Sequence, residues 1–239
     1  MIIGINGYAG SGKDTVGKLI QIAACKEIPE GNHIDDLIDD YDPHHQWWLE
    51  ERSGWEIKKW AGKLKTIASL LTGIPQEKFE DQEFKKTNLG PEWNQPIPGE
   101  DWVDGKPVPV PMTVRDLLQK LGTDACRNGL HKNTWVNALM ADYKIHSEHF
   151  NDIANGRETG DGYPNWIITD TRFPNEAQAI KDAGGIVIRV DRPGVKAINA
   201  HPSETGLDNW NFDHKIMNGS DMVSLLFTVG SILRKEKLL

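Results

Sequence analysis

Short apolar runs alternate with helical stripes along the chain. The run Ile2–Asn6 is rich in β-branched residues and leads straight into glycines, and the later runs Trp166–Asp170 and Ile186–Val190 are similar. Runs of this length and composition are typical of buried strands. Elsewhere, apolar residues recur at intervals of three and four positions, as on one face of an amphipathic helix. The alternation predicts an α/β fold around a mostly parallel sheet.

The helical spacing is clearest in four segments, which are 16–23, 64–71, 114–121 and 222–233. Gly73 and Pro75 end the second segment, and Thr113 with Asp116 forms a capping box before the third. Weaker patterns predict short strands at 55–61 and 216–217 and helices at 136–143 and 176–183. The prolines between 90 and 111 predict an irregular loop or an edge excursion there, and not a helix.

The segment from Gly7 to Thr15 reads GYAGSGKDT, which has the spacing of a phosphate-binding loop. The segment follows a predicted strand and opens a predicted helix. Its backbone N–H groups and the positive end of the helix dipole can therefore bind phosphate. We expect Lys13 to reach the β- and γ-phosphates. The nucleotide-binding candidates in this loop are Gly10, Ser11, Gly12, Lys13, Asp14 and Thr15.

Two acidic positions are candidates for holding Mg²⁺. The common pattern has Ser or Thr directly after the lysine, whereas this chain has Asp14 there and Thr15 next, and either can offer oxygen to a hard cation. The run Trp166–Asp170 resembles a Walker B strand, and an Asp at the end of such a strand can orient a metal-bound water. The candidate metal ligands are thus Asp14, Thr15 and Asp170. The acidic residues between 35 and 42 lack regular ligand spacing and are interpreted as a solvated face.

Several basic residues are candidates for binding phosphate. Arg172 lies two residues after Asp170 and can grip a phosphoryl group in bidentate fashion, with an ion pair to Asp170 or Glu176 as the alternative. Lys63 and Lys65 lie where a helix is expected to begin, and cations there oppose the helix dipole unless an anion binds between them. Ordinary surface lysines are the alternative for this pair. Three arginines can face phosphate, base or solvent, namely Arg115, Arg127 and Arg192.

Charge and composition narrow the possible functions. The 239 residues include 27 basic and 35 acidic ones, giving a net charge of −8, so we expect no stable binding to nucleic acid or to an anionic membrane. The apolar runs are too short to cross a bilayer, and no basic region precedes Ile2, so we expect neither a membrane span nor a secretory signal. With only Cys25 and Cys126, a disulfide framework is excluded and a reducing cytoplasm is favoured.

With these residues placed, the chain resembles the phage-type deoxynucleoside monophosphate kinases, a branch of the P-loop nucleoside monophosphate kinases. The similar segments, which run in the expected order, are Gly10–Thr15, Leu117–Asp124, Ile167–Arg172, Val190–Gly194 and His201–Leu207. The resemblance implies a single domain with the P-loop NTPase fold, in which helices flank a mostly parallel five-stranded sheet. Its core is expected at about 1–27 and 163–239, and an inserted helical region that binds the acceptor at about 28–162.

The resemblance also implies a reaction, in which ATP with Mg²⁺ phosphorylates a deoxynucleoside 5′-monophosphate to the diphosphate for deoxynucleotide supply. Lys13, Asp170 and Arg172 are then expected to be catalytic, and Arg192 to lie on the ATP side. The expected acceptor-binding residues are Lys63, Lys65, Arg115, Arg127, Thr171, Arg172 and Glu204. A kinase of another small phosphorylated metabolite and a non-catalytic ATP-binding module are the alternatives. A phage-encoded chain would work in the host cytoplasm, and the oligomeric state, a homodimer included, stays open.

Overall fold

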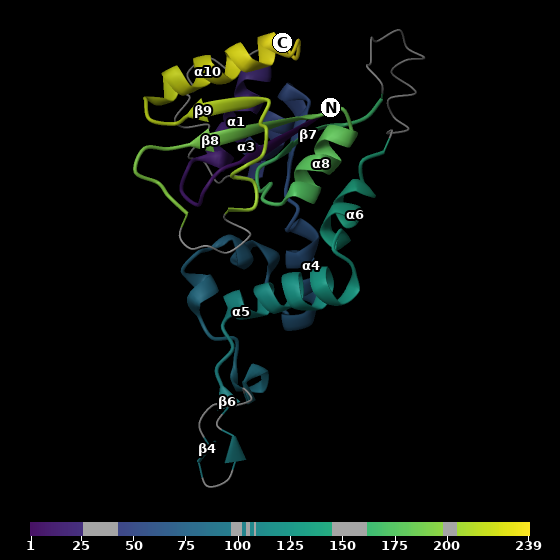
Figure 1. The fold of residues 1–239 in the computed structure, drawn as a ribbon, viewed down its shortest axis with the longest axis vertical. Helices are drawn as coiled ribbons and strands as arrows, with labels where there is room; N and C mark the ends of the chain where they lie inside the picture. Colours follow the sequence, from purple (N-terminus) through teal and green to yellow (C-terminus); the bar gives the residue numbers. More distant parts are fainter. Residues whose placement is uncertain (26–42, 97–101, 104–105, 108, 145–161, 198–204) are drawn as a thin grey trace. The chain divides into compact units, whose positions relative to one another are not determined.

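The computed structural model describes residues 1–25, 43–96, 102–103, 106–107, 109–144, 162–197 and 205–239 (Figure 1). The chain forms two compact units, the first made of residues 1–60 and 139–239 and the second of residues 61–138. The acidic run at 35–42 and the candidate Glu204 lie outside the described residues. The sequence predicted an inserted region at about 28–162. The compact second unit is shorter and covers residues 61–138.

A five-stranded sheet forms the centre of the first unit (Figure 1). Its strands are β1 (Ile2–Asn6), β2 (Trp55–Lys58), β7 (Asn165–Ile168), β8 (Ile186–Asp191) and β9 (His214–Met217). Their order is β2-β7-β1-β8-β9 and all four pairings are parallel, which confirms the predicted α/β architecture. Because parallel neighbours end at the same edge, the segments that follow β1, β7 and β8 emerge side by side, where ligands bind in such sheets.

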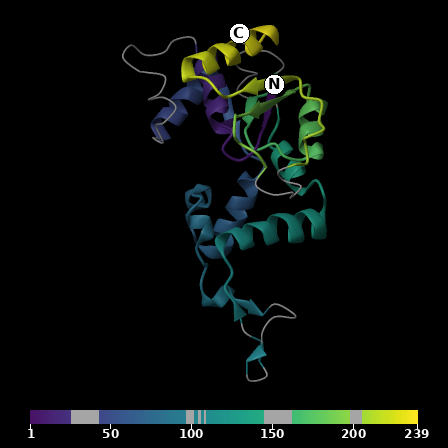
Figure 2. The same cartoon turned by 60° about the vertical axis from the view of Figure 1, so that its left-hand side comes forward.

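Helices cover both faces of this sheet (Figure 2). They are α1 (Lys13–Ala24), α3 (Pro43–Ser53), α8 (Pro174–Asp182) and α10 (Met222–Lys235). Alternate residues of β1, Ile3 and Ile5, pack in one buried cluster with side chains of α1 and α10. On the opposite face, Ile180 of α8 lies so close to Gly4 that a Cβ there would overlap it. The strand β1 is therefore buried on both sides, and this fixes the position of the loop that follows it.

The second unit is mainly helical. Its elements are α4 (Gly62–Thr72), the 3₁₀ turns η1 (Gln76–Glu80), η2 (Phe84–Lys86) and η3 (Pro91–Trp93), the short strands β3 (Gln95–Pro96), β4 (Trp102–Val103), β5 (Lys106–Pro107) and β6 (Pro109–Val110), α5 (Val114–Gln119) and η4 (Lys120–Leu130). The helix α6 (Thr134–Met140) spans the boundary with the first unit. The core of the second unit contains Ala68, Phe79, Met112, Val114 and Leu117. None of the helices in the described part of the chain is long and apolar enough to span a membrane.

The predicted capping box before α5 is confirmed, but the helix after it is not a uniform α-helix. The Thr113 hydroxyl accepts from Asp116 N at 3.1 Å, and the Asp116 carboxylate accepts from Thr113 N at 3.0 Å. From Lys120 the chain continues as the π-helix η4. Gly122 lies in this element, where a Cβ would be only 2.9 Å from Leu64 Cδ2. The close approach to Leu64 is a tertiary contact that periodicity cannot reveal.

Two segments are more regular in the structure than the sequence pattern indicates. The proline-rich range 90–111 is not only irregular, because it contains η3 and two antiparallel pairs, β3 with β6 and β4 with β5. The helix α3 was not predicted at all. Its apolar residues do not form a continuous stripe, and its contact with α1 depends on the fold.

Candidate active site

The loop between β1 and α1 requires glycine at the spacing positions of its motif for two reasons. Gly10 and Gly12 have φ angles of 79° and 92°, in the left-handed region that side chains rarely adopt. A Cβ on Gly12 would also overlap the side-chain amide of Asn218, and a Cβ on Gly7 would overlap the carbonyl oxygen of Val190. The loop is therefore closely enclosed by the ends of β8 and β9.

Lys13 is the first residue of α1, and its side chain bonds back to the beginning of the loop. Its Nζ donates to the carbonyl oxygens of Gly7 and Tyr8, both at 2.8 Å. The Tyr8 carbonyl also accepts from the backbone N–H of Ser11 at 3.1 Å, so a tight turn forms between them. The ammonium group thus lies at the rim of the loop, where a phosphate oxygen could replace the two carbonyls as its partner.

Two side chains hold the outer face of the loop. Asn218 Nδ2 donates to the Ser11 carbonyl at 2.9 Å, while its own backbone N–H donates to the Asp191 carbonyl at 2.7 Å. Arg192 Nη1 lies 3.5 Å from the Gly10 carbonyl oxygen, in an exposed contact. The arginine is thus beside the loop between β1 and α1.

Asp14 lies in the first turn of α1, with Thr15, and contacts two elements of the sheet. Thr169 Oγ1 donates to Asp14 Oδ1 at 2.7 Å, and Lys59 Nζ lies 3.4 Å from the same oxygen. Desolvation opposes ionisation, but the charges of Lys59 and Lys13 and the Thr169 hydroxyl outweigh it and lower the pKa of Asp14. The carboxylate is therefore charged at neutral pH, and its side chain is still 70% exposed, so it remains accessible to a cation.

Asp170 lies in the turn directly after β7, which ends at Ile168 rather than at the acid. Its Oδ1 accepts from the backbone N–H of Trp60 at 2.8 Å. The Trp60 indole donates to Thr171 Oγ1 at 3.3 Å, and both Trp60 and Thr171 are buried. The segment after β2 therefore holds the Asp170 carboxylate at the edge of the sheet that also carries the phosphate-binding loop. Through Thr169, the structure brings the two candidate carboxylates to neighbouring positions.

Arg172 begins the connection to α8, and Glu176 fixes its main chain. Glu176 Oε2 accepts from the backbone N–H of Arg172 at 2.8 Å and from that of Phe173 at 3.1 Å. Glu176 is 2% exposed and lies in the first turn of α8, where an acid also interacts favourably with the helix dipole. The Glu176 carboxylate thus engages the main chain at Arg172, a role that the sequence analysis did not anticipate.

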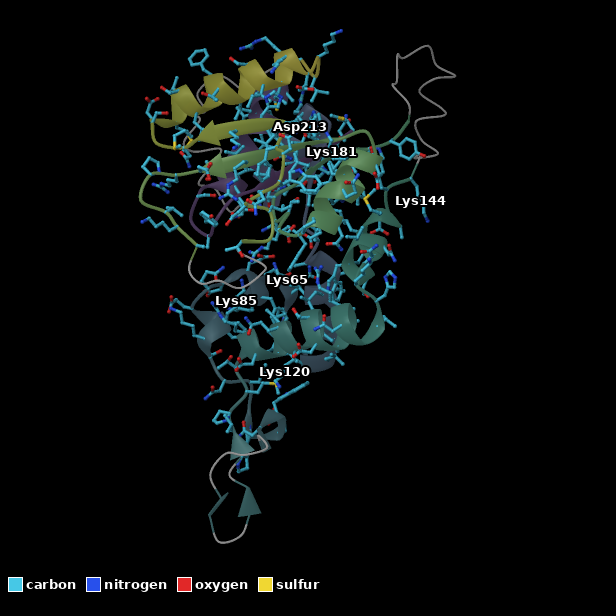
Figure 3. The ribbon with its side chains drawn as sticks, viewed as in Figure 1. Lys65, Lys85, Lys120, Lys144, Lys181 and Asp213 are labelled. Atoms are coloured by element: carbon cyan, nitrogen blue, oxygen red, sulfur yellow. The ribbon has the colours of Figure 1, made fainter. Side chains whose placement is uncertain are left out.

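The remaining candidates lie in the second unit. Lys65 is buried on α4 and forms an ion pair with Glu80 of η1, so it is not an ordinary surface lysine (Figure 3). Lys63 on α4 and Arg115 on α5 are exposed, and Arg127 on η4 is half-buried. The structure therefore gathers the phosphate-loop residues with Asp170, Thr171 and Arg172 in one unit and the other basic candidates in the second.

The sequence analysis missed several residues of this site. Lys59 and Trp60 lie within the range 55–61 that was predicted as a strand, directly after β2 ends, and Asn218 follows the strand predicted at 216–217. Each could have been proposed from the rule that ligands lie beyond the carboxyl ends of parallel strands. Which of these ends lies beside the loop depends on the strand order, and the sequence pattern alone does not give it.

Comparisons with known proteins point to one family. The family model for deoxynucleotide monophosphate kinase matches residues 106–229. A provisionally named deoxynucleotide monophosphate kinase of Acanthamoeba polyphaga mimivirus is 31% identical over 168 residues, which are 67% of this chain and 72% of that protein. The deoxynucleotide monophosphate kinase of Enterobacteria phage T4 is 33% identical over 122 residues, 51% of this chain and 46% of its own length.

A relative from Escherichia phage T5, named deoxynucleoside-5′-monophosphate kinase, extends the similarity over nearly the whole chain. It is 26% identical over 256 aligned positions, which cover 95% of this chain and 92% of that protein. The family model alone matches more than half of the residues, including the turn with Asp170 and Arg172. The chain therefore belongs to the deoxynucleotide monophosphate kinase family.

Proposed function

We propose that this chain transfers the γ-phosphoryl group of ATP, in the presence of Mg²⁺, to a deoxynucleoside 5′-monophosphate and thereby supplies deoxynucleoside diphosphates. The observation that carries the proposal is a glycine-rich loop with Lys13 and Asp14, at the edge of the sheet where Asp170 follows β7. The relatives named as deoxynucleotide monophosphate kinases support the same acceptor class. A nucleotide-binding module would need the loop but would have no use for acceptor-binding groups.

The residues of the loop fit a bound phosphate chain. Ser11 Oγ is buried and has no hydrogen-bond partner within the described residues, so it has capacity for another ligand. Gly10 has nothing within 4 Å of the place where a Cβ would stand, so its backbone is open to a close approach. Asp14, Thr15 and Asp170 offer the oxygen ligands that Mg²⁺ prefers. When bound, ATP supplies the phosphoryl group and Mg²⁺ neutralises charge on its oxygens.

The reaction requires positioning more than proton transfer. An oxygen of the acceptor phosphate is already ionised, so it can attack the γ-phosphorus in line while the bond to the β–γ bridging oxygen breaks. We assign Lys13 and the loop amides to the donor phosphates and Arg172 to the acceptor and migrating groups, since its planar guanidinium suits phosphate oxygens. Thr171 supports the adjoining main chain.

The acceptor side involves further basic residues, and these assignments are proposals too. Lys63, Lys65, Arg115 and Arg127 are the candidates, and Glu204 is a polar candidate outside the described residues. For Lys65, a bound phosphate would have to replace Glu80 as the partner of its ammonium group. Arg192, which contacts the Gly10 carbonyl, belongs to the donor side.

An acceptor screen tests the proposed function. Purified protein with ATP and Mg²⁺ is given dAMP, dGMP, dCMP or dTMP in turn, and formation of ADP and of the deoxynucleoside diphosphate is measured. We expect acceptor-dependent ADP formation with at least one of them. Replacing Lys13 by Met should lower it by about 10² to 10³-fold, the usual cost of losing one transition-state charge contact. Gly184→Ala, at the far end of α8, is the control.

Three other outcomes would lead to other conclusions. ADP formation that depends only on phosphorylated metabolites other than nucleotides would make the chain a kinase of another class. Tight ATP binding without any acceptor-dependent turnover would make it a binding module. No ATP binding at all would contradict the assignment of the loop itself.

A further inference from the structure

Arg189 is a buried cation near the end of β8, next to β1. Its side chain is 8% exposed. Its Nη1 donates to Asn6 Oδ1 at 2.6 Å, its Nε donates to Asp191 Oδ1 at 2.7 Å, and its guanidinium carbon lies 4.3 Å from the centroid of the Tyr8 ring. A buried charge is costly unless it is paired, so these three contacts hold the guanidinium in one place.

The contact with Asn6 determines how the Asn6 amide is oriented. Asn6 is the last residue of β1 and is 4% exposed. A guanidinium can only donate hydrogen bonds, so the amide oxygen must face Arg189 and the NH₂ group must face the other way. That NH₂ group donates to the Thr171 carbonyl at 2.8 Å. Arg189 thus fixes, through one side chain, the turn that carries Asp170 and Arg172.

Arg189 also contacts Tyr8, which belongs to the phosphate-binding loop. The Tyr8 ring lies over the guanidinium, and its hydroxyl donates to Asp208 Oδ1 at 2.9 Å. The same Asp208 oxygen is 3.5 Å from Arg189 Nη1. Tyr8 is therefore held at its ring and at its hydroxyl, and its carbonyl is the one that accepts from Ser11 N and from Lys13. The position of Tyr8 therefore determines where its carbonyl, and with it this part of the phosphate-binding loop, lies.

We propose that Arg189 is a positioning residue for phosphoryl transfer, because it holds the phosphate-binding loop through Tyr8 and the Asp170–Arg172 turn through Asn6 in one fixed arrangement. The inference rests on the proposed function for its catalytic readout. It assigns no contact between Arg189 and a substrate. The alternative is that Arg189 only stabilises the first unit. In that case its loss would lower stability without changing the turnover of folded molecules.

The variant Arg189→Lys separates these two roles. Lysine keeps the charge, but a single ammonium cannot reproduce the planar fork that reaches Asn6 and Asp191 together. In protein that is folded at the assay temperature, we expect kcat to fall at least tenfold with both substrates saturating. The KM values for ATP and for the acceptor should change less than threefold. A kcat within twofold of the parent protein, in the folded variant, would overturn the proposal.

Lys181→Met is the matched control. It removes another ion pair of the same unit, in which Lys181 of α8 binds Asp213 at 2.7 Å near the start of β8 (Figure 3). We expect this variant to unfold more easily than the parent protein but to keep its kcat. An equal loss of kcat in both variants would show that turnover follows general stability, and it would contradict a positioning role.

Two further measurements keep the test decisive if Arg189→Lys folds poorly or if the parent protein proves inactive. Tyr8→Phe keeps the ring on the guanidinium and loses only the bond to Asp208, so a smaller fall in kcat is expected. Hydrogen exchange does not depend on activity. Arg189→Lys should accelerate exchange of amides in 8–12 and 169–172 at least tenfold over the Lys181→Met variant. Equal exchange in the two variants would overturn the inference even where no acceptor is phosphorylated.

Discussion

The site depends on which groups surround each glycine and each carboxylate. Gly12 adopts φ 92° and lies against Asn218, so its backbone and its missing side chain both matter. Asp14 carries its charge next to Lys13 because Lys59 and Thr169 hold it. A motif of nine residues therefore works only with partners that lie far away in the sequence.

Replacing Gly12 by Ala should damage nucleotide binding more than it damages folding. The new Cβ would be strained at a positive φ and would overlap the Asn218 amide that holds the Ser11 carbonyl, so the loop must open. We expect the dissociation constant for ATP, measured by calorimetry, to rise at least tenfold. Gly184→Ala is the control, because Gly184 has φ 74° with nothing within 4 Å of the added Cβ. It should cost about 1 kcal/mol of stability and leave binding unchanged. Parent-like affinity in Gly12→Ala would contradict the role given to this contact.

The site residues that the sequence predicted differ from those it missed in what determines their positions. Gly12, Lys13 and Asp170 were predictable because a local spacing and a strand end define them. Asn218 and Lys59 reach the loop only because β9 and β2 end at the same edge of the sheet. Their positions follow from the strand order, which no local pattern encodes.

At the element scale, the same distinction separates the helices. The apolar stripe of α10 predicted that helix closely, because the residues of that face pack in one buried cluster with side chains of α1 and of the sheet. The π-helix η4 interrupts a similar stripe, since Gly122 passes close to Leu64 and its carbonyl accepts from the Trp135 indole at 2.8 Å. Where a tertiary contact sets the local geometry, periodicity predicts the helix but not its type.

The start of α8 provides a test of how an element positions a functional residue. Glu176→Ala would leave the partly buried N–H groups of Arg172 and Phe173 without their acceptor, at a cost of about 1 kcal/mol of stability. Because the main chain at Arg172 would also be released, we expect kcat to fall in the folded fraction. Glu176→Gln keeps one acceptor oxygen and should show a smaller effect on both quantities. Urea unfolding and steady-state assays measure them, and equal effects of the two substitutions would contradict this interpretation.

The ion pair between α8 and the segment before β9 predicts a pH dependence of stability. Burial opposes ionisation of Asp213, but Lys181, the Val187 N–H and the charge of His214 lower its pKa. An acid whose pKa is lower in the folded state stabilises fully above its unfolded pKa, about 3.9, and loses that effect as the pH falls through the folded value. The difference in unfolding free energy between the parent protein and Asp213→Asn should therefore be constant from pH 7 to 5 and shrink below about pH 4. Urea titrations at each pH measure it, and a difference that grows on acidification would contradict the assignment.

The whole chain forms two units that each have a core, and the candidate residues are distributed between them. The first contains the phosphate-binding loop and Asp170, and the second contains Lys63, Lys65, Arg115 and Arg127. The division was only partly predictable. The sequence pattern predicted helices and a proline-rich loop in the middle of the chain, but β2 and α3, from the same range, belong to the first unit. β2 joins the sheet by pairing with β7, over a hundred positions away.

This division predicts that damage to one core will separate ATP binding from phosphoryl transfer. Phe79 is fully buried in the second unit, and Phe79→Ala should destabilise that unit by about 3–5 kcal/mol. If the acceptor-binding residues are in the second unit, the variant should still bind ATP while acceptor-dependent turnover falls more than tenfold. Hydrogen exchange should accelerate in 61–138 and not in the strands of the sheet. Leu233→Ala is the converse variant, because Leu233 lies in the core of the first unit. It should weaken ATP binding, and the strands of the sheet should lose protection from hydrogen exchange. Phe79→Ala could instead lose ATP binding and show faster hydrogen exchange throughout the chain. That result would show that the two cores unfold together. Donor and acceptor binding could then not be assigned to separate units.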